Sequence, residues 1–158
     1  LFKLSLPLLI FYQFNVSKNS GNQTILVAED DSINFLLLKK ILELKNYKVL
    51  RASNGQEAVD MCSSNPNIDL VFMDIKMPIL DGFKALKKVK KNRPNLPVIA
   101  QTAYSSAEDK EKINNAGFVD YITKPLNKEK IFELLEKIFA QKEIATSNTE
   151  KNNEGFLF

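Results

Sequence analysis

Short apolar runs alternate with longer segments of helical period along residues 24–140. The apolar runs are TILVA (24–28), KVLRA (48–52), DLVFM (69–73), PVIAQ (97–101) and DYIT (120–123). Their lengths and residue types are typical of β-strands. Strict alternation of strands with helices indicates a parallel sheet, because right-handed crossovers place the helices on its faces. We therefore predict an α/β fold with a doubly wound, five-stranded parallel sheet and helices on both faces.

The segments between the runs carry helix patterns with start and stop signals. Two segments place their apolar residues on one helix face: residues 32–45 with Ile33, Leu37, Ile41 and Leu44, and residues 131–139 with Ile131, Leu134, Leu135 and Ile138. Asn54 begins another predicted helix. A capping box from Ser105 to Glu108 predicts the start of a further helix, which Gly117 ends.

The two ends of the chain differ in composition from the part between them. Residues 1–14 are apolar but fall short of the roughly 20 residues that span a bilayer, so we interpret residues 2–8 as a half-buried strand, with a signal-peptide core as the alternative. Residues 15–23 are polar and predict a linker. The chain begins without Met, which leads us to expect a fragment. We predict one domain over residues 24–141, an extension over 1–23 and a flexible tail over 142–158.

Composition and charge narrow the possible chemistry. The 158 residues carry a net charge of +3 and suit one domain with tails. The lysine-rich run 84–93 spreads its charges over several faces of a helix whose core positions are Phe83, Leu86 and Val89. This favours a solvated surface over a phosphate-binding one. No histidine is present and Cys62 is the single cysteine, which excludes histidine-based catalysis and an internal disulfide.

Polar side chains follow most of the predicted strands. Glu29, Asp30 and Asp31 follow the first strand, Asp74 the third, Thr102 the fourth and Lys124 the fifth, whereas the second ends on turn residues alone. Each has an ordinary explanation as a helix cap or loop residue. The carboxyl ends of parallel strands nevertheless meet at one edge of a sheet, where ligands bind. We therefore expect these side chains to converge.

Crowded carboxylates carry an electrostatic cost that a cation would remove. Two like charges about 4 Å apart repel by roughly 4 kcal/mol at an effective dielectric of 20. Ligands that are all oxygen favour a hard ion, and Mg²⁺ suits a site with few protein ligands better than Ca²⁺. Beside such an ion, Asp74 can act as a nucleophile toward a phosphoryl group. Lys124 would supply a cation and Thr102 a hydroxyl to the phosphoryl oxygens.

Four ordered motifs resemble those of the receiver domain of two-component response regulators. They are ILVAEDDSIN (25–34), VFMDIKMPILDG (71–82), IAQTA (99–103) and DYITKPL (120–126), and the resemblance covers Thr24 to about Ala140. It implies a flavodoxin-like fold with strand order 2-1-3-4-5. It also implies a signalling domain rather than an enzyme, one that takes a phosphoryl group from a phosphohistidine donor and catalyses its own phosphorylation and dephosphorylation.

The resemblance also implies roles for single residues. Asp74 is the expected phosphoacceptor, helped by Lys124. The expected Mg²⁺ ligands are Asp30, Asp74 and the backbone carbonyl of Lys76, with Glu29 acting through water. Thr102 and Tyr121 resemble a switch pair that responds to phosphorylation. Asp31 and Asp81 stand where the family often carries asparagine, and Asp31 adds negative charge near the expected metal.

The motifs EDDSIN and AQTA look most like receivers at the carboxyl end of hybrid sensor histidine kinases. Residues 2–8 are similar to the closing strand of a kinase ATP-binding domain. The expected partner is a histidine kinase or a histidine phosphotransfer protein, with a homodimer through the face from strand 4 to helix 5 as a further expectation. We expect neither nucleic acid nor membrane contact, and a cytoplasmic location; an inner-membrane anchor on the parent chain stays open.

Three alternatives remain beside a receiver within a hybrid kinase. The first is a stand-alone, single-domain response regulator. The second is a degenerate receiver that acts only as a binding module, although the acceptor, the lysine and the acidic pair are all present. The third is an aspartyl-phosphate hydrolase of the haloacid-dehalogenase type, whose acid/base aspartate would stand at the position of Lys76.

Overall fold

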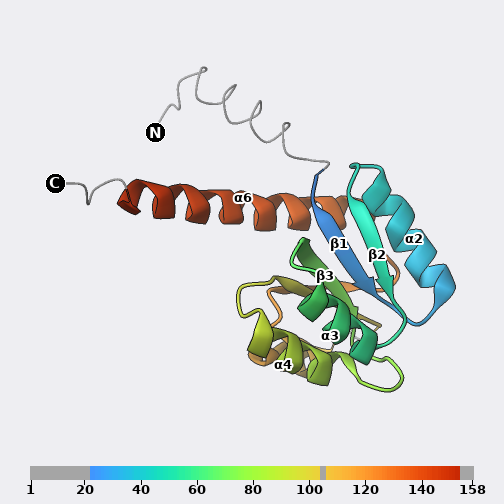
Figure 1. Cartoon of the computed structure of the whole chain (residues 1–158). Helices are drawn as coiled ribbons and strands as arrows, with labels where there is room; N and C mark the ends of the chain where they lie inside the picture. Colours follow the sequence, from blue (N-terminus) through green and yellow to red (C-terminus); the bar gives the residue numbers. More distant parts are fainter. Residues whose placement is uncertain (1–21, 104–105, 154–158) are drawn as a thin grey trace. The chain divides into compact units, whose positions relative to one another are not determined.

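The computed structural model describes residues 22–103 and 106–153, with their side chains as far as residue 141. The elements are β1 (Thr24–Ala28), α2 (Ser32–Glu43), β2 (Lys48–Ala52), α3 (Gly55–Ser64), β3 (Ile68–Asp74), α4 (Gly82–Asn92), β4 (Val98–Thr102), α5 (Ala107–Ala116), β5 (Asp120–Thr123) and α6 (Lys128–Asn153) (Figure 1). Strands and helices alternate strictly within this range, as the hydrophobic pattern predicts.

The five strands form one parallel sheet in the order β2-β1-β3-β4-β5. This confirms the predicted fold class and strand order. The bounds predicted for β1, β2 and β5 agree with the structure, whereas β3 is longer at both ends than predicted. β4 begins at Val98 rather than Pro97. Proline lacks the N–H that a strand ladder requires, which accounts for the later start.

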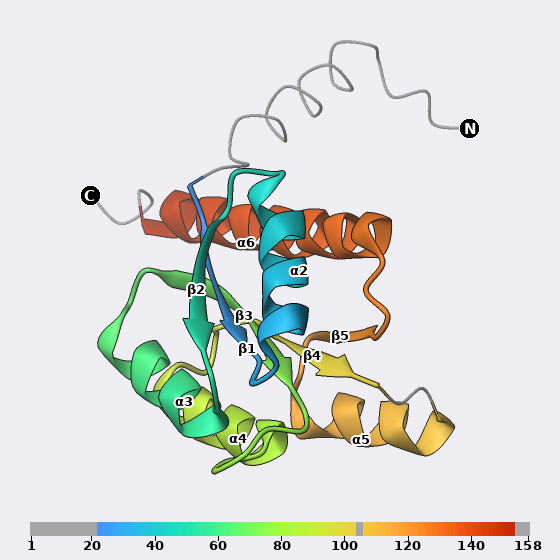
Figure 2. The ribbon, with the colours of Figure 1, turned by 90° about the vertical axis from the view of Figure 1, so that its right-hand side faces the viewer.

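Buried side chains cover both faces of the sheet, because successive residues of a strand point to opposite sides. On one face, strand residues pack with residues of α3, α4 and α5: Leu26, Ala28, Val71, Met73, Val98 and Ala100. The alternate strand residues, among them Val27, Phe72 and Ile99, are fully buried on the other face. α2 contacts β1 and β2 there, and Figure 2 shows α2 and α3 on opposite sides of these strands.

The buried face of α2 differs from the predicted one. Ile33, Leu37 and Leu44 are 77%, 47% and 67% exposed, and only Ile41 of the predicted face is buried. The helix buries Phe35, Leu38, Ile41 and Leu42 instead. The helix carries apolar residues on two sides, so helical spacing alone is compatible with burial of either side. Contact with β1 and β2 selects one of them, and the prediction was wrong because that contact is tertiary.

Side chains at the helix starts explain several polar positions. Asn54 accepts a hydrogen bond from the backbone N–H of Glu57 and caps α3, as predicted. The N-cap of α5 is Ser106, one residue after the predicted Ser105, which lies outside the described residues. Gly117 ends α5 with a φ of 100°, the left-handed backbone that favours glycine. The remaining caps, Asp31 and Asp81, belong to the site and are described below.

The lysines of α4 make local contacts. Lys84 pairs with Asp81 at 2.9 Å, Lys88 donates to Gln56, and Lys90 donates to the backbone carbonyls of Pro94 and Leu96. Leu86 and Val89 are buried, which confirms these two predicted core positions. The contacts favour the solvated-surface interpretation of this helix. In the described range, no helix has both the length and the apolar character needed to cross a membrane.

The chain divides into two compact units, of which Asn19–Leu126 contains the whole sheet. The described residues after Leu126 belong to the other unit, and α6 lies within it. Ile131 and Leu135 of α6 are fully buried, in agreement with the predicted apolar face. The helix continues beyond Gln141, where we placed the end of the domain, to Asn153. Residues 1–21 lie outside the described range, so their assignment as strand and linker stays a prediction, as does the flexible tail.

Candidate functional site

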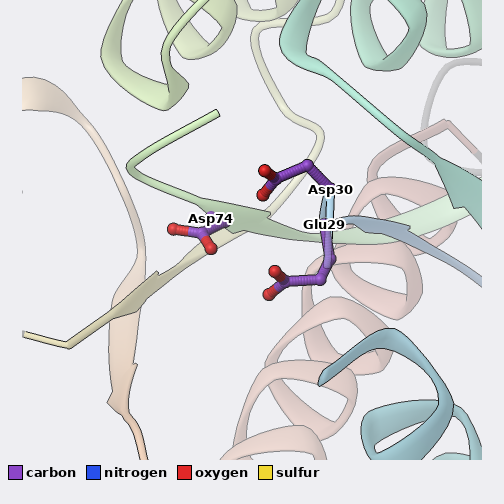
Figure 3. A group of neighbouring side chains, drawn as sticks. All are labelled: Glu29, Asp30 and Asp74. Carbon is purple, nitrogen blue, oxygen red and sulfur yellow. The ribbon is translucent and has the colours of Figure 1, made fainter. Parts of the chain in front are cut away.

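Three carboxylates meet at the carboxyl ends of β1 and β3. Glu29 and Asp30 follow β1, Asp74 ends β3, and one carboxylate oxygen from each lies within 4.8 Å of the others. Figure 3 shows the three side chains turned toward a shared space. Glu29 and Asp74 are 1% and 7% exposed, whereas Asp30 is exposed. The convergence predicted from the strand ends is therefore present in the structure.

Lys124 bridges the two buried carboxylates. Its Nζ lies 2.6 Å from Asp74 Oδ2 and 2.8 Å from Glu29 Oε2. The lysine comes from the end of β5, and its backbone N–H donates to the carbonyl of Thr102, which ties it to the end of β4. A cation from one edge of the sheet thus offsets two of the charges that the central strands bring together.

The electrostatics of this group shift two pKa values. Burial raises the pKa of Glu29, and the nearby charge of Asp74 raises it further, although the hydrogen bond from Lys124 acts in the opposite direction. For Lys124, burial is the largest single influence and lowers the pKa. The hydrogen bonds and charges of Asp74 and Glu29 together outweigh it, so the pKa of Lys124 is raised. The lysine is therefore held firmly in its charged form.

The loop after β3 holds the carboxylate of Asp74 through a backbone hydrogen bond. Asp74 Oδ1 accepts a hydrogen bond of 2.9 Å from the backbone N–H of Lys76. The backbone N–H of Gly82 donates to the carbonyl of Ile75, and a Cβ added at Gly82 would collide with the backbone carbonyl of Asp74. Only glycine allows this close approach. The turn that the sequence places after Asp74 is thus folded back tightly against the residue itself.

A comparison with protein families decides what kind of site this is. The model of the response regulator receiver domain matches residues 25–136. The chain belongs to this family. The matched range contains all five strands, the acidic group and Lys124. The resemblance seen in the four motifs is therefore confirmed at the level of the family.

Individual relatives of this receiver occur in different protein contexts. It is 36% identical over 121 residues to hybrid signal transduction histidine kinase I of Dictyostelium discoideum, covering 72% of this chain but only 7% of that protein. It is 31% identical to the polar-differentiation response regulator DivK of Brucella anthropi, covering 72% of this chain and 93% of DivK. The fold matches the crystal structure of the receiver domain of sensor histidine kinase PA1611 from Pseudomonas aeruginosa PAO1 at a TM-score of 0.70 and 29% identity. The match covers 76% of this chain and 99% of that one. That receiver is described with a magnesium ion coordinated in its active site cleft.

The two departures from the family pattern are helix caps in this receiver. Asp31 accepts hydrogen bonds from the backbone N–H groups of Ile33 and Asn34 and begins α2. Asp81 accepts from the backbone N–H of Lys84 and begins α4. The backbone N–H of Lys84 and, to a smaller extent, its ammonium group donate hydrogen bonds to Asp81 and lower the pKa of that carboxyl. The negative charge of Asp31 thus lies at the positive N-terminal end of α2, which stabilises it beside the acidic group.

The other predicted site residues lie on β4 and β5. Thr102 ends β4 and is 3% exposed; it follows Gln101, which is the register partner of Asp74. Tyr121 is the register partner of Ala100, so it lies two residues further from the strand end than Thr102, and it packs against the core. The two residues of the expected switch pair therefore occupy neighbouring strands, of which β4 pairs with the strand of Asp74 and β5 lies beyond it. The role of the Lys76 backbone carbonyl as a metal ligand stays a prediction.

Two further residues at this edge were missed by the sequence analysis. Arg51 lies within β2, ahead of the turn residues that follow this strand, and donates to the backbone carbonyl of Asp30 and to Ser32 Oγ, each at 3.1 Å. Gln101 is 1% exposed, and its side-chain nitrogen has no hydrogen-bond partner within the described part of the receiver. No spacing rule reveals either residue, although a buried glutamine in an otherwise apolar strand is itself an unusual signal.

Cys62 takes no part in the site. It is 2% exposed within α3, among the apolar residues that pack against the sheet. Burial raises the pKa of its thiol to about 11. A thiol in this state is not a nucleophile at neutral pH.

Proposed function

We propose that this receiver accepts a phosphoryl group on Asp74 in a two-component phosphorelay, in a reaction that depends on Mg²⁺. The observation that supports it is the arrangement of Asp74 itself. Its carboxylate is held by the backbone N–H of Lys76 on one oxygen and by Lys124 on the other, within 4.8 Å of two more carboxylates. A purely structural carboxylate has no need of two neighbours of its own charge.

The donor set fits a hard divalent cation. Carboxylate oxygens are the ligands that Mg²⁺ prefers, and the repulsion among three of them is relieved when such an ion is bound. Asp30 and Asp74 would hold the ion directly, together with the backbone carbonyl of Lys76, and Glu29 would act through water. When bound, the ion supplies positive charge to the phosphoryl oxygens during transfer.

The chain's own residues supply the remaining functions. An oxygen of Asp74 attacks the phosphorus atom of a phosphohistidine, and the P–N bond breaks as the new P–O bond forms, with the imidazole as the leaving group. Lys124 already contacts Asp74 Oδ2 and is charged, so it is placed to bind an oxygen of the incoming phosphoryl group. Thr102 offers a hydroxyl at the end of the neighbouring strand. Phosphorylation then biases Thr102 and Tyr121 toward a second arrangement and changes the surface around β4 and β5.

The direct test is the intact mass of the chain after incubation with acetyl phosphate and Mg²⁺. We expect the gain of one phosphoryl group, which disappears in Asp74→Ala and after addition of a chelator. Asp69→Ala is the matched control: Asp69 lies on the same strand, where its carboxylate accepts the backbone N–H of Thr24 at the opposite end of the sheet. A modification that survives Asp74→Ala would show that the acceptor is another residue.

We further propose that the receiver belongs to a hybrid sensor histidine kinase and acts in the cytoplasm. Its likeness to a hybrid kinase and to the PA1611 receiver supports this context, whereas the likeness to DivK over nearly its whole length keeps the single-domain alternative open. The donor would be a histidine kinase domain or a histidine phosphotransfer protein. Exposed apolar residues next to the acid-bearing segments, Ile33 on α2 and Ile79 after β3, offer contact area to such a protein.

Transfer from a protein donor can be separated from transfer from a small one. Ile33→Ser and Ile79→Ser should slow phosphorylation by a phosphorylated histidine phosphotransfer protein while leaving the rate with acetyl phosphate unchanged. Leu44→Ser is the control, because Leu44 is also largely exposed but lies at the far end of α2, as its C-cap. Equal slowing with both donors would place the effect in the site itself. The homodimer through the face from strand 4 to helix 5, which are β4 and α6 in the labels of Figure 1, stays a prediction.

A further inference from the structure

Arg51 links β2 to the loop that carries the acidic pair. Its Nη2 donates to the backbone carbonyl of Asp30 and to the hydroxyl of Ser32, and its guanidinium lies 4.7 Å from the centre of the Phe35 ring. The arginine thus contacts three successive parts of the chain: the loop, the first residue of α2 and the buried face of that helix. We propose that Arg51 is a positioning residue that fixes Asp30 for binding a divalent cation, an inference that rests on the proposed function.

The bonds around Asp30 constrain its backbone on every side. The backbone N–H of Glu29 donates to the carbonyl of Ala52, and the backbone N–H of Asp31 donates to Glu29 Oε1. Asp31 then caps α2, and Arg51 holds the carbonyl between these two fixed points. None of these bonds uses the carboxylate of Asp30. The loop is therefore constrained while the exposed carboxylate of Asp30 is left for a ligand, which lowers the entropy lost when an ion binds.

The geometry calls for arginine rather than any cation. A guanidinium is planar, presents several donors in a fixed fork and stacks on an aromatic ring. In the structure one nitrogen, Nη2, serves both acceptors while Cζ lies over the Phe35 ring, and the buried Nε has no hydrogen-bond partner in the described part of the chain. A lysine at the same position keeps the charge but loses the stacking and the fixed direction of the donors. Arg51→Lys therefore tests the positioning effect of Arg51 separately from the effect of its charge.

Charge alone predicts the opposite outcome. A positive group close to the acidic pair repels a divalent cation, so removing the charge would strengthen Mg²⁺ binding if electrostatics dominated. If positioning dominates, both Arg51→Lys and Arg51→Met weaken binding, because both release the carbonyl of Asp30. Residues that orient metal ligands typically contribute about 10-fold or more to metal affinity. We expect a loss of about 10-fold for Arg51→Lys and a smaller one, of a few-fold, for Ser32→Ala, which removes a single acceptor.

The experiment is an amide chemical-shift titration of the isotope-labelled chain with MgCl₂ at constant ionic strength. Arg93 provides the matched control, because its guanidinium also donates to backbone carbonyls, those of Cys62, Asn65, Pro66 and Ile68, at the other end of the sheet. Arg93→Lys should lower the melting temperature and leave the Mg²⁺ affinity unchanged. Arg51→Lys should lower the Mg²⁺ affinity in a chain that is still folded at the temperature of the titration.

Each outcome bears on a different claim. If the unaltered chain binds Mg²⁺ and Arg51→Lys binds it equally well, the positioning role is wrong. Tighter binding by Arg51→Met would assign Arg51 a purely electrostatic effect and also overturn the inference. If the unaltered chain shows no saturable shifts with Mg²⁺, the proposed function fails first and there is no cation site to position. Weaker binding by both Arg51 variants and unchanged binding by Arg93→Lys support the inference.

Discussion

Removing the lysine that joins the two buried carboxylates should destabilise the domain strongly when no metal is present. In Lys124→Met, Glu29 and Asp74 lose the cation at 2.8 Å and 2.6 Å and are left facing each other. Their oxygens lie within 4.8 Å, where two like charges repel by about 3.5 kcal/mol at an effective dielectric of about 20. Loss of one partner from a buried ion pair typically costs about 3 to 5 kcal/mol. Both estimates point to a loss of about 3 kcal/mol.

The assay is urea unfolding at neutral pH in the presence of a chelator. Lys39→Met is the matched control, since Lys39 pairs with Glu43 at 3.6 Å on the exposed side of α2. Exposed pairs of this kind contribute less than about 1 kcal/mol. Adding Glu29→Gln to Lys124→Met should restore most of the lost free energy of unfolding, because it removes one of the two repelling charges. Addition of Mg²⁺ should also restore part of it.

A small effect would refute this account. If Lys124→Met lost no more than Lys39→Met, the carboxylates would have to be relieved without the lysine, either by water or by proton uptake. If the double variant were no more stable than Lys124→Met, repulsion between Glu29 and Asp74 would not be the cause. In both cases the crowding of charge that supports the metal site would be weaker than the distances indicate.

Three further predictions concern the same edge of the sheet. Gln101→Leu should raise the free energy of unfolding by about 1 kcal/mol, because the buried side-chain nitrogen of Gln101 has no partner in the described part of the chain; a lower urea midpoint would mean that the amide is paired. Ile79→Gly should also stabilise the chain, by up to about 1 kcal/mol, since Ile79 is a β-branched residue at a φ of 68°, and an unchanged melting temperature would show that the loop carries no strain. The third prediction is a pH dependence. The raised pKa of Lys124 means that its contribution is fully present below its ordinary value of 10.5 and is lost as the pH rises through the raised value. The raised pKa of Glu29 acts at the acidic side, where stability should increase as the pH falls through that value toward 4.5. Urea midpoints across the pH range test both signs, and the alkaline loss should vanish in Lys124→Met.

Much of this site is readable in the sequence because of how parallel sheets are built. Side chains that follow consecutive parallel strands must meet at one edge, so Asp30, Asp74 and Lys124 could be brought together without coordinates. The strand bounds follow from short apolar runs between polar breaks. These features depend on local pattern and on topology, and both are contained in the order of residues along the chain.

What the sequence left hidden depends on tertiary contact. The helix α2 is apolar on two sides, and only its position on β1 and β2 decides that Leu38 is buried and Leu37 exposed. Arg51 extends from β2 to the loop of Asp30, and the hydrophobic pattern of the sequence cannot predict such a contact between elements. Asp31 and Asp81 were interpreted by comparison with a family pattern, whereas their hydrogen bonds show that helix capping explains both.

The order of the strands gives this edge a distribution of charge that no single element possesses. The central strands β1 and β3 carry the acids, while the flanking strands β2 and β5 each send a long basic side chain inward, Arg51 from one side and Lys124 from the other. Two basic side chains thus flank three carboxylates, so the centre of this edge is negative and each flank is positive. If the proposed phosphoryl transfer takes place here, the incoming group lies between basic side chains from the two edge strands, and changes confined to β2 or to the end of β5 alter its surroundings without altering Asp74.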